Sequence, residues 1–331
     1  GFSNIFMSAI GVDTPSGSIP ESLFATFQMT FAIITPALMI GAFVERIKFS
    51  AMLIFLSMWL LIVYVPVTHW VWGGGILSSW GTMDFAGGIV VHATAGTAAL
   101  VTALTLGKRR GFPKSITPPH SPILTMIGAS MLWIGWFGFN AGSALGANGG
   151  AGMAMLVTHI SAATASLVWM FIEWKRFGKP SLIGIVTGMV AGLATVTPAS
   201  GYIGVPGGLI LGFFGGLLCY LAVDFIRGKL QIDDSLDVFA VHGVGGILGT
   251  LLVAFLATST FSGLGLAEGQ TAVTQFFVQL KAVILTVVWT SVFTYLILKI
   301  TSFIVPLRVE EQEEIEGLDL RSHGEKGYHS D

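Results

Sequence analysis

Two stretches of the chain place a single histidine inside an otherwise apolar, glycine-rich segment. They are DFAGGIVVHATAGTAAL at residues 84–100 and DVFAVHGVGGILGTLL at residues 237–252. Each begins with an aspartate and carries one histidine, His92 or His242. A polar ring in hydrocarbon costs several kcal/mol unless it finds a partner. Two histidines in such similar settings therefore point to a joint role.

The composition around these stretches is that of a membrane protein. Of 331 residues, 53% are hydrophobic and only 10% are charged, whereas soluble domains carry roughly 25% charged residues. We therefore predict an all-α polytopic membrane protein. The net charge of −2 gives no indication of nucleic-acid binding, and the single cysteine, Cys219, allows neither a disulfide nor a thiolate metal site within one chain.

Apolar segments long enough to cross a ~30 Å hydrocarbon core recur nine times. We expect spans at 22–43, 50–72, 84–107, 121–143, 151–174, 181–199, 204–227, 236–258 and 273–304.

Lysine and arginine follow every second span, and the alternate loops between the spans contain neither. This positive-inside pattern predicts that the chain starts outside and ends in the cytoplasm. Lys281, early in the last span, is the exception and should face a protein or water surface or snorkel. His92 is then on a span that runs inward and His242 on one that runs outward. This indicates an inverted repeat whose two sites meet near the membrane midplane, around a central pore.

Several structures would satisfy the two histidines. Either ring could be a core residue bonded to a backbone carbonyl, and ligation of a haem by both is a competing interpretation. A zinc site would need a third or fourth ligand, and none presents itself. Two neutral imidazoles that share a hydrogen bond would instead line a narrow path without fixed charge, which suits a small polar solute. We expect no metal and no cofactor.

The aspartates and aromatic residues near the histidine segments are open to two interpretations. Asp84 and Asp237 are expected to cap the histidine helices, and a buried Asp84 near the outer mouth would also bias the entrance toward cations. The aromatic side chains could form packing stripes or membrane belts. Because Phe31, Trp72, Trp136 and Ser143 all lie toward the outer side, they could also form a cation–π cage for a small cation.

The sequence resembles the ammonium transporter, methylammonium permease and Rhesus protein family, on its bacterial side. The resemblance covers nearly the whole chain and its motifs follow in family order. They are FQMTFAIITPALMIGAFVER, WGGGIL, DFAGGIVVHATAG, GWFGFNAGSA, GKPSLIG, TPASGYIGV, DDSLDVFAVHGVGGILG and EGLDLRSHGEKGY. Family members normally have eleven spans, and this chain begins in the loop before the third.

The resemblance implies a role for each residue of the pathway. Phe31, Trp72 and Ser143 would form an outer recruitment site, and Phe31 stacked on Phe139 would form a gate. Trp136 would line the pore, His92 and His242 would be the paired pore histidines, and Asp84 would be the buried acid near the entrance. Ammonium would lose its proton in this pore and pass as ammonia.

The resemblance also implies the setting of the protein. It predicts a transmembrane domain at 1–307 and a cytosolic regulatory tail at 308–331, in a homotrimer of the cell membrane that takes up ammonium and methylammonium and is no enzyme. A PII-type signalling protein would bind the tail, although a merely solvated tail is the alternative. Two other functions remain open, namely an ammonium sensor built on the same pore and a haem-binding electron-transfer protein.

Overall fold

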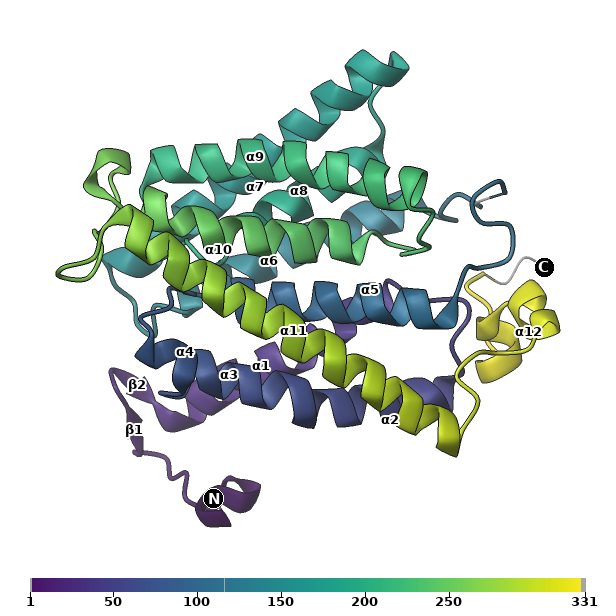
Figure 1. The fold of residues 1–331 in the computed structure, drawn as a ribbon, viewed down its shortest axis with the longest axis horizontal. Coiled ribbons are helices and arrows are strands. Elements are labelled where there is room, and N and C mark those ends of the chain that lie inside the picture. Colours follow the sequence, from purple (N-terminus) through teal and green to yellow (C-terminus); the bar gives the residue numbers. More distant parts are fainter. Residues whose placement is uncertain (1, 116, 329–331) are drawn as a thin grey trace.

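The computed structural model describes residues 2–115 and 117–328, and this part of the chain is mostly helical (Figure 1). The α-helices are α1 (Glu21–Ile40), α2 (Phe49–Trp59), α3 (Val65–Trp72), α4 (Ile76–Ser79), α5 (Thr94–Leu106), α6 (Pro122–Gly142), α7 (Gly149–Phe177), α8 (Leu182–Val196), α9 (Val205–Val223), α10 (Val244–Leu256), α11 (Ala272–Ile304) and α12 (Glu311–Glu316). π-Helical turns are η2 (Leu60–Tyr64), η3 (Gly88–Ala93), η4 (Asp224–Lys229), η5 (Phe239–Gly243) and η7 (Asp319–His323), and 3-10 turns are η1 (Phe2–Met7) and η6 (Ser259–Phe261). A short hairpin pairs β1 (Pro15–Ser16) with β2 (Ile19–Pro20).

The predicted fold class is confirmed. In the described residues, 8 continuous helical segments are long and apolar enough to cross a membrane, and α8 is a shorter apolar helix of 15 residues. Together they account for the nine expected spans. The bounds differ at the second span, expected to end at residue 72, whose segment runs to Ser79, and at the third, expected from residue 84, whose helix begins only at Gly88.

Local side-chain chemistry explains where several helices begin. The Ser121, Asn148 and Ser181 side chains each accept a hydrogen bond from a backbone N–H in the first turn of α6, α7 and α8. Thr271 and Thr274 form a reciprocal capping box at the start of α11. These caps satisfy N–H groups that a helix leaves without partners at its start.

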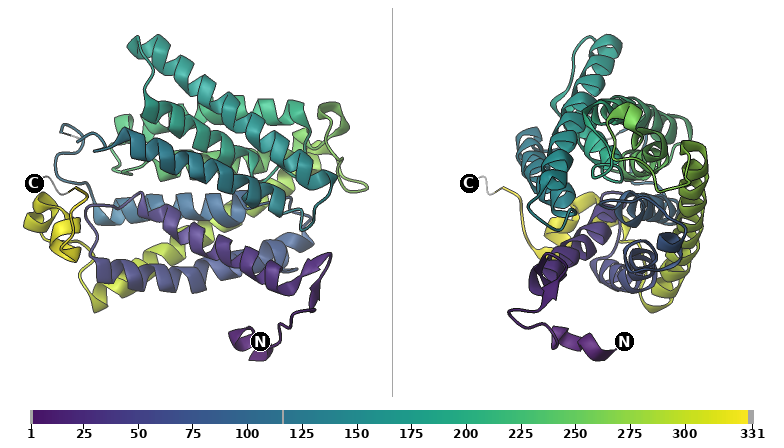
Figure 2. Two further views of the ribbon diagram at one scale, coloured as in Figure 1. Left: turned by 180° about the vertical axis from the view of Figure 1, so that it is seen from behind. Right: turned by 90° about the vertical axis from the view of Figure 1, so that its left-hand side faces the viewer.

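The helices form two groups that one long helix joins. α1–α5 pack together in one group and α6–α10 in the other, and α11 runs obliquely across both (Figure 1). Figure 2, in its right-hand view along the helices, separates the same two groups, with α11 beside them. Buried Ala282, Ile297 and Leu298 attach α11 to the core of the first group, and its contacts with α10 attach it to the second.

The two histidine segments have the same construction in opposite groups. η3 carries His92 and continues into α5, and η5 carries His242 and continues into α10, with 13 residues in each α-helix. The segments also pack reciprocally, because η3 contacts α10 and η5 contacts α5. This is the inverted repeat that the sequence predicted.

The two ends of the bundle differ in charge. One end carries the segments 73–87, 143–148, 197–204 and 257–271, which contain no lysine or arginine and which we call the cation-poor face. The other end carries 41–48, 107–115, 175–181, 227–238 and 305–328, which we call the cation-rich face. Hydrogen bonds join the segments within each face, for example from Leu264 N to Tyr202 O at the first and from Lys48 N to Leu307 O at the second.

Candidate functional site

The first histidine helix begins on a single carboxylate. Asp84 Oδ1 accepts hydrogen bonds from the backbone N–H groups of Gly87 and Gly88 at 2.9 and 2.6 Å, and Oδ2 accepts from Ile89 and Val90 at 2.8 and 3.1 Å. All four N–H groups belong to the chain that turns into η3. The predicted capping role of Asp84 is therefore confirmed.

The second histidine helix begins differently, and the predicted cap was wrong here. Asp237 has a left-handed backbone conformation, with φ of 57°, and its side chain forms an ion pair with Arg227 at 3.0 Å. The carboxylate that caps η5 is Asp234, whose Oδ2 accepts a hydrogen bond from Phe239 N at 2.7 Å. A positive φ turns the Asp237 side chain away from the helix start, a feature that sequence spacing does not reveal.

The two histidines meet in the interior. His92 Nδ1 and His242 Nδ1 are 3.2 Å apart, so one ring donates a hydrogen bond to the other. His92 is fully buried and His242 is 7% exposed. Within the described residues, His92 Nε2 has no hydrogen-bond partner. The pair thus leaves a polar edge facing its surroundings without a fixed charge.

Glycines allow this close approach of the two histidine helices. A Cβ atom on Gly96 would come within 2.3 Å of the Gly243 backbone, and one on Gly246 would come within 2.5 Å of His92 Cβ. Any larger residue at these positions would push the helices apart. The glycines of the two motifs are therefore required by the crossing itself.

An aromatic column leads from the cation-poor face to His92. Phe31 packs edge-on against Trp72 with ring centroids 5.6 Å apart, and it contacts Phe139 at 4.4 Å. Phe139 and Trp136 in turn stack over His92, with centroids 6.0 and 5.3 Å away. The predicted site residues on α1, α3 and α6 are thus brought together beside η3.

Two cavities lie on either side of the Phe31–Phe139 contact. Phe31, Trp72 and Ser143 line the first, of about 360 Å³, at the cation-poor face. Phe139, Trp136 and His92 line the second, also of about 360 Å³. Because Phe27 lines both, the two cavities adjoin, and the phenylalanine pair stands between them.

Some of these side chains have their polar atoms already engaged. Ser143 Oγ donates to the Phe139 carbonyl at 2.9 Å, which leaves its lone pairs to accept from a ligand. Trp72 Nε1 donates to the Asp84 carbonyl at 2.8 Å, and Trp136 Nε1 donates to Thr197 Oγ1 at 2.9 Å. Both indoles therefore present ring faces, rather than N–H groups, to the cavities.

Sequence reasoning missed three aromatic residues that line the first cavity, Phe24, Phe27 and Phe85. Phe27 packs against Phe31 at 4.8 Å, and Phe85 lines the cavity from the Asp84 turn. Phe27 lies one helical turn before Phe31 on the same face, a spacing that also fits simple packing, and Phe85 has no periodic signal because it lies in a loop.

Comparison with known proteins identifies the family of this chain. A profile of the Ammonium Transporter Family matches residues 1–328. The chain belongs to this family. It is 47% identical over 311 residues to the ammonium transporter Amt1 of Archaeoglobus fulgidus, an alignment that covers 93% of this chain and 78% of that protein.

Solved structures of transporters agree with the sequence comparison. Mep2 of Candida albicans is similar with a TM-score of 0.82 and 37% identity, over 89% of this chain and 68% of that one. A structure described as a sensor Amt protein is similar with a TM-score of 0.84 and 31% identity, over 91% of this chain and 76% of that one. The predicted family is thereby confirmed, and ammonium transport is the function that its members share by name.

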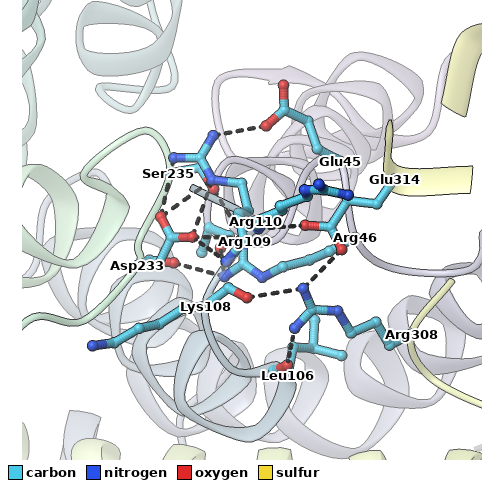
Figure 3. Close-up of polar contacts among 11 residues, drawn as sticks. Glu45, Arg46, Leu106, Lys108, Arg109, Arg110, Asp233, Ser235, Arg308 and Glu314 are labelled. Atoms are coloured by element: carbon cyan, nitrogen blue, oxygen red, sulfur yellow. Dashed lines mark hydrogen bonds and ion pairs between the residues drawn. The ribbon is translucent and has the colours of Figure 1, made fainter. Parts of the chain in front are cut away.

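Besides the histidine pair, this ammonium transporter has a polar cluster at the cation-rich face, shown in Figure 3. At its centre Asp233 accepts three contacts from Arg109, which are the backbone N–H at 2.7 Å and two side-chain nitrogens at 3.0 Å. Although burial opposes ionisation, the Arg109 guanidinium and amide hold the pKa of Asp233 below its usual value. Arg109 also binds Glu45 at 2.8 Å.

A buried arginine and a tail arginine extend this cluster. Arg46 is fully buried and donates to the Asp233 carbonyl at 2.6 Å and to Ser235 Oγ at 2.9 Å. Arg308, beyond α11, donates to the carbonyls of Leu106 and Lys108, where α5 ends, at 2.9 and 2.8 Å. The end of the first histidine helix, the start of the second and the beginning of the tail are therefore bound together (Figure 3).

The remaining residues singled out from the sequence lie outside both clusters. The Lys281 ammonium is 3.7 Å from the centre of the Trp80 ring, so it packs on a protein surface as expected. Cys219 is buried beside the Val241 carbonyl. In residues 2–115 and 117–328, no group of three or more His, Cys, Asp or Glu side chains is arranged to hold a metal ion.

Proposed function

We propose that this chain moves ammonium from the cation-poor face, deprotonates it, and conducts ammonia past His92 and His242. The observation that carries the proposal is the pair of cavities beside Phe31 and Phe139, of which the second is lined by His92, the hydrogen-bond partner of His242. Family membership supplies the substrate, and this geometry supports a path for it.

Recruitment would take place in the first cavity. Trp72, Phe31 and Phe27 surround it with aromatic rings, and a cation over such a ring gains ~0.5–2 kcal/mol. The Ser143 hydroxyl oxygen accepts an N–H from the ammonium ion. Asp84, which lies behind the cavity wall, adds a negative charge that attracts a cation.

The proton would leave before the second cavity is crossed. A bare cation in an apolar pore is costly, so NH4+ separates into NH3 and H+ at the aromatic contact. Ammonia then passes the imidazole edges as a neutral molecule, and the proton can follow over the two rings. Potassium, which is close to ammonium in size, has no proton to lose and is rejected.

The positive-inside rule supports an orientation for this path. The cation-poor face would lie outside the cell and the cation-rich face in the cytoplasm. The transmembrane part would be residues 1–307 and the cytosolic tail 308–331. We also infer a homotrimer in the cell membrane and a PII-type protein at the tail, on family resemblance. Two contacts attach this tail to the rest of the chain: Glu314 accepts from the backbone N–H of Arg110, and Arg308 donates to the carbonyls of Leu106 and Lys108.

The direct test is uptake of labelled methylammonium by cells or vesicles that contain this chain. We expect saturable uptake that ammonium inhibits and potassium does not. The absence of uptake at confirmed membrane levels would contradict the proposal. Removing residues after Arg308 should leave insertion unchanged and alter the rate or the binding of a PII-type protein.

An ammonium sensor is the second candidate, because one similar solved structure carries that description. A sensor would bind ammonium in the same aromatic cavity without net uptake. Binding by the purified protein, together with no accumulation of methylammonium in vesicles, would favour the sensor. A haem protein would instead show a Soret band in its visible spectrum, which we do not expect.

A further inference from the structure

A buried glutamine in α11 lies where the two histidine helices meet near the cation-poor face. Gln279 is fully buried, and its Nε2 donates to the carbonyls of Met83 and Thr250 at 2.7 and 2.9 Å. Its Oε1 accepts from Met83 N at 2.8 Å and from Gln275 Nε2 at 3.1 Å. The four hydrogen bonds use two donors and two acceptor positions, which is the full capacity of a glutamine amide.

Apart from Gln275, which lies in the same helix, the partners of Gln279 lie in or next to the two histidine segments. Met83 directly precedes Asp84, whose carboxylate caps η3. Thr250 lies in α10, eight residues or about two turns after His242. A Cβ on Gly88 would lie 2.7 Å from Thr250 Oγ1, so η3 begins directly against α10 at this point.

α11 belongs to neither half of the repeat, and it crosses both. Paired hydrogen bonds from the Gln279 amide to both backbone groups of Met83 fix the loop in position and orientation, as a β-bridge would. The third bond, to Thr250, fixes the same amide to the other histidine helix. Simple helix packing would not require a side chain whose every polar atom contacts these backbones.

We propose that Gln279 is a positioning residue for the ammonium pathway. It holds the Asp84 turn against α10 and thereby sets how His92 faces His242. The inference rests on the proposed conduction past these histidines. Because Trp72 Nε1 binds the Asp84 carbonyl, the same turn also connects Gln279 to the recruitment cavity.

The test combines transport with a structural signal from the histidine rings. Gln279→Met keeps the size of the side chain and removes its hydrogen bonds. We expect methylammonium uptake to fall about tenfold, and the ring ¹⁵N resonances of His92 and His242 to shift. Thr290→Val is the matched control, because Thr290 is buried in the same helix and its hydroxyl has no partner in the described residues. Uptake and ring resonances should be unchanged in it.

A double-mutant cycle then shows whether Gln279 acts through Asp84. In an Asp84→Asn background, Gln279→Met should cause less than a twofold further loss, since the turn that it positions is already altered. A full tenfold further loss, or wild-type uptake and ring signals in Gln279→Met alone, would overturn the inference. Absence of uptake in the wild type would contradict the proposed function instead, and the ring signals would still test the positioning.

A second variant covers the case in which Gln279→Met does not reach the membrane. Gln275→Met removes the bond to Gln279 Oε1 and the 3.0 Å bond to the Gly81 carbonyl. The ring resonances should shift in the same direction by a smaller amount. Unchanged resonances in this variant would also contradict the inference.

Discussion

The two histidine helices share one backbone design and differ in how they begin. Asp84 caps the first with four backbone hydrogen bonds and, in the described part of the chain, pairs with no cationic side chain. The second begins in a group of three aspartates, of which Asp233 binds Arg109 and Asp237 binds Arg227. Asp234 supplies the cap itself.

This difference separates two tasks. The Asp84 carboxyl has no cationic partner among the described residues, and it is the acid that an ammonium ion entering the aromatic cavity would meet. At the second helix, Asp233 and Asp237 are bound to arginines. Arg308, at the beginning of the tail, donates to the carbonyl of Lys108, the residue before Arg109 (Figure 3). We infer that the first helix start serves recruitment and the second serves attachment to the tail.

The comparison predicts its largest effect at the two caps. Asp84→Ala leaves four buried N–H groups without a partner, and each such group costs ~1–3 kcal/mol. We expect uptake to fall more than about a hundredfold and thermal stability to drop clearly. Asp234→Ala, which removes the partner of Phe239 N, should cost only a fraction of this. Equal losses in both variants, measured at equal protein content, would refute the asymmetry.

A smaller effect is expected at the arginine cluster. The Asp233 side chain is 1% exposed, so Arg109→Gln leaves a buried charge without its main partner, at a cost of ~3–5 kcal/mol. Arg110→Gln is the matched control, because Arg110 is 58% exposed and such a pair contributes ~0–1 kcal/mol. Denaturation of the detergent-solubilised proteins measures both. A similar loss of stability in the two variants would contradict a particular contribution of the buried Arg109–Asp233 pair.

Recruitment should respond to the loss of one indole. Trp72→Leu removes a cation–π contact of ~0.5–2 kcal/mol, so the half-saturation concentration for methylammonium should rise several-fold to tens-fold with assembly intact. Trp174→Leu, at an exposed position outside the cavity, is the control. An unchanged concentration dependence in Trp72→Leu would remove Trp72 from the proposed site.

The smallest effect is a pH dependence at the second helix start. Burial raises the pKa of Asp237 to about 7, against the opposing effect of Arg227. Because the folded state favours the protonated acid, the stability from this group is present at low pH and is lost as the pH rises toward about 7. Asp237→Asn should therefore gain thermal stability relative to wild type between about pH 5 and 8. The control is Asp13→Asn, at an exposed position, for which we expect no such gain. If Asp237→Asn also showed no gain in stability, the raised pKa of Asp237 would be contradicted.

Periodicity and charge predicted most of the fold. The spans followed from apolar length, and the inverted repeat followed from the parity of His92 and His242. Bounds were less accurate where a turn replaced the expected helix, as at residues 84–87. Such a turn depends on the positive φ of Gly87 and on the backbone hydrogen bonds that the Asp84 carboxylate accepts, and a hydropathy pattern contains neither.

Some residues of the candidate site could likewise be predicted from the sequence, and others could not. Aromatic and histidine positions could be named from motifs, because their residue types are unusual in apolar helices. That Asp234, and not Asp237, caps the second helix depends on the backbone conformation of Asp237. The role of Gln279 depends on which loop α11 contacts. Neither feature has a local sequence signature. For Gln279, the available signal was the presence of a glutamine within an apolar helix.

The central claim is that a neutral, hydrogen-bonded histidine pair conducts ammonia and excludes potassium. Its most direct test is the uptake of labelled methylammonium measured beside potassium flux, in vesicles with equal amounts of wild type, His92→Ala or His242→Ala. Each variant removes one side of the 3.2 Å contact. We predict that both variants lower uptake or admit potassium. Wild-type rate and selectivity in both would show that the histidines only pack the interior.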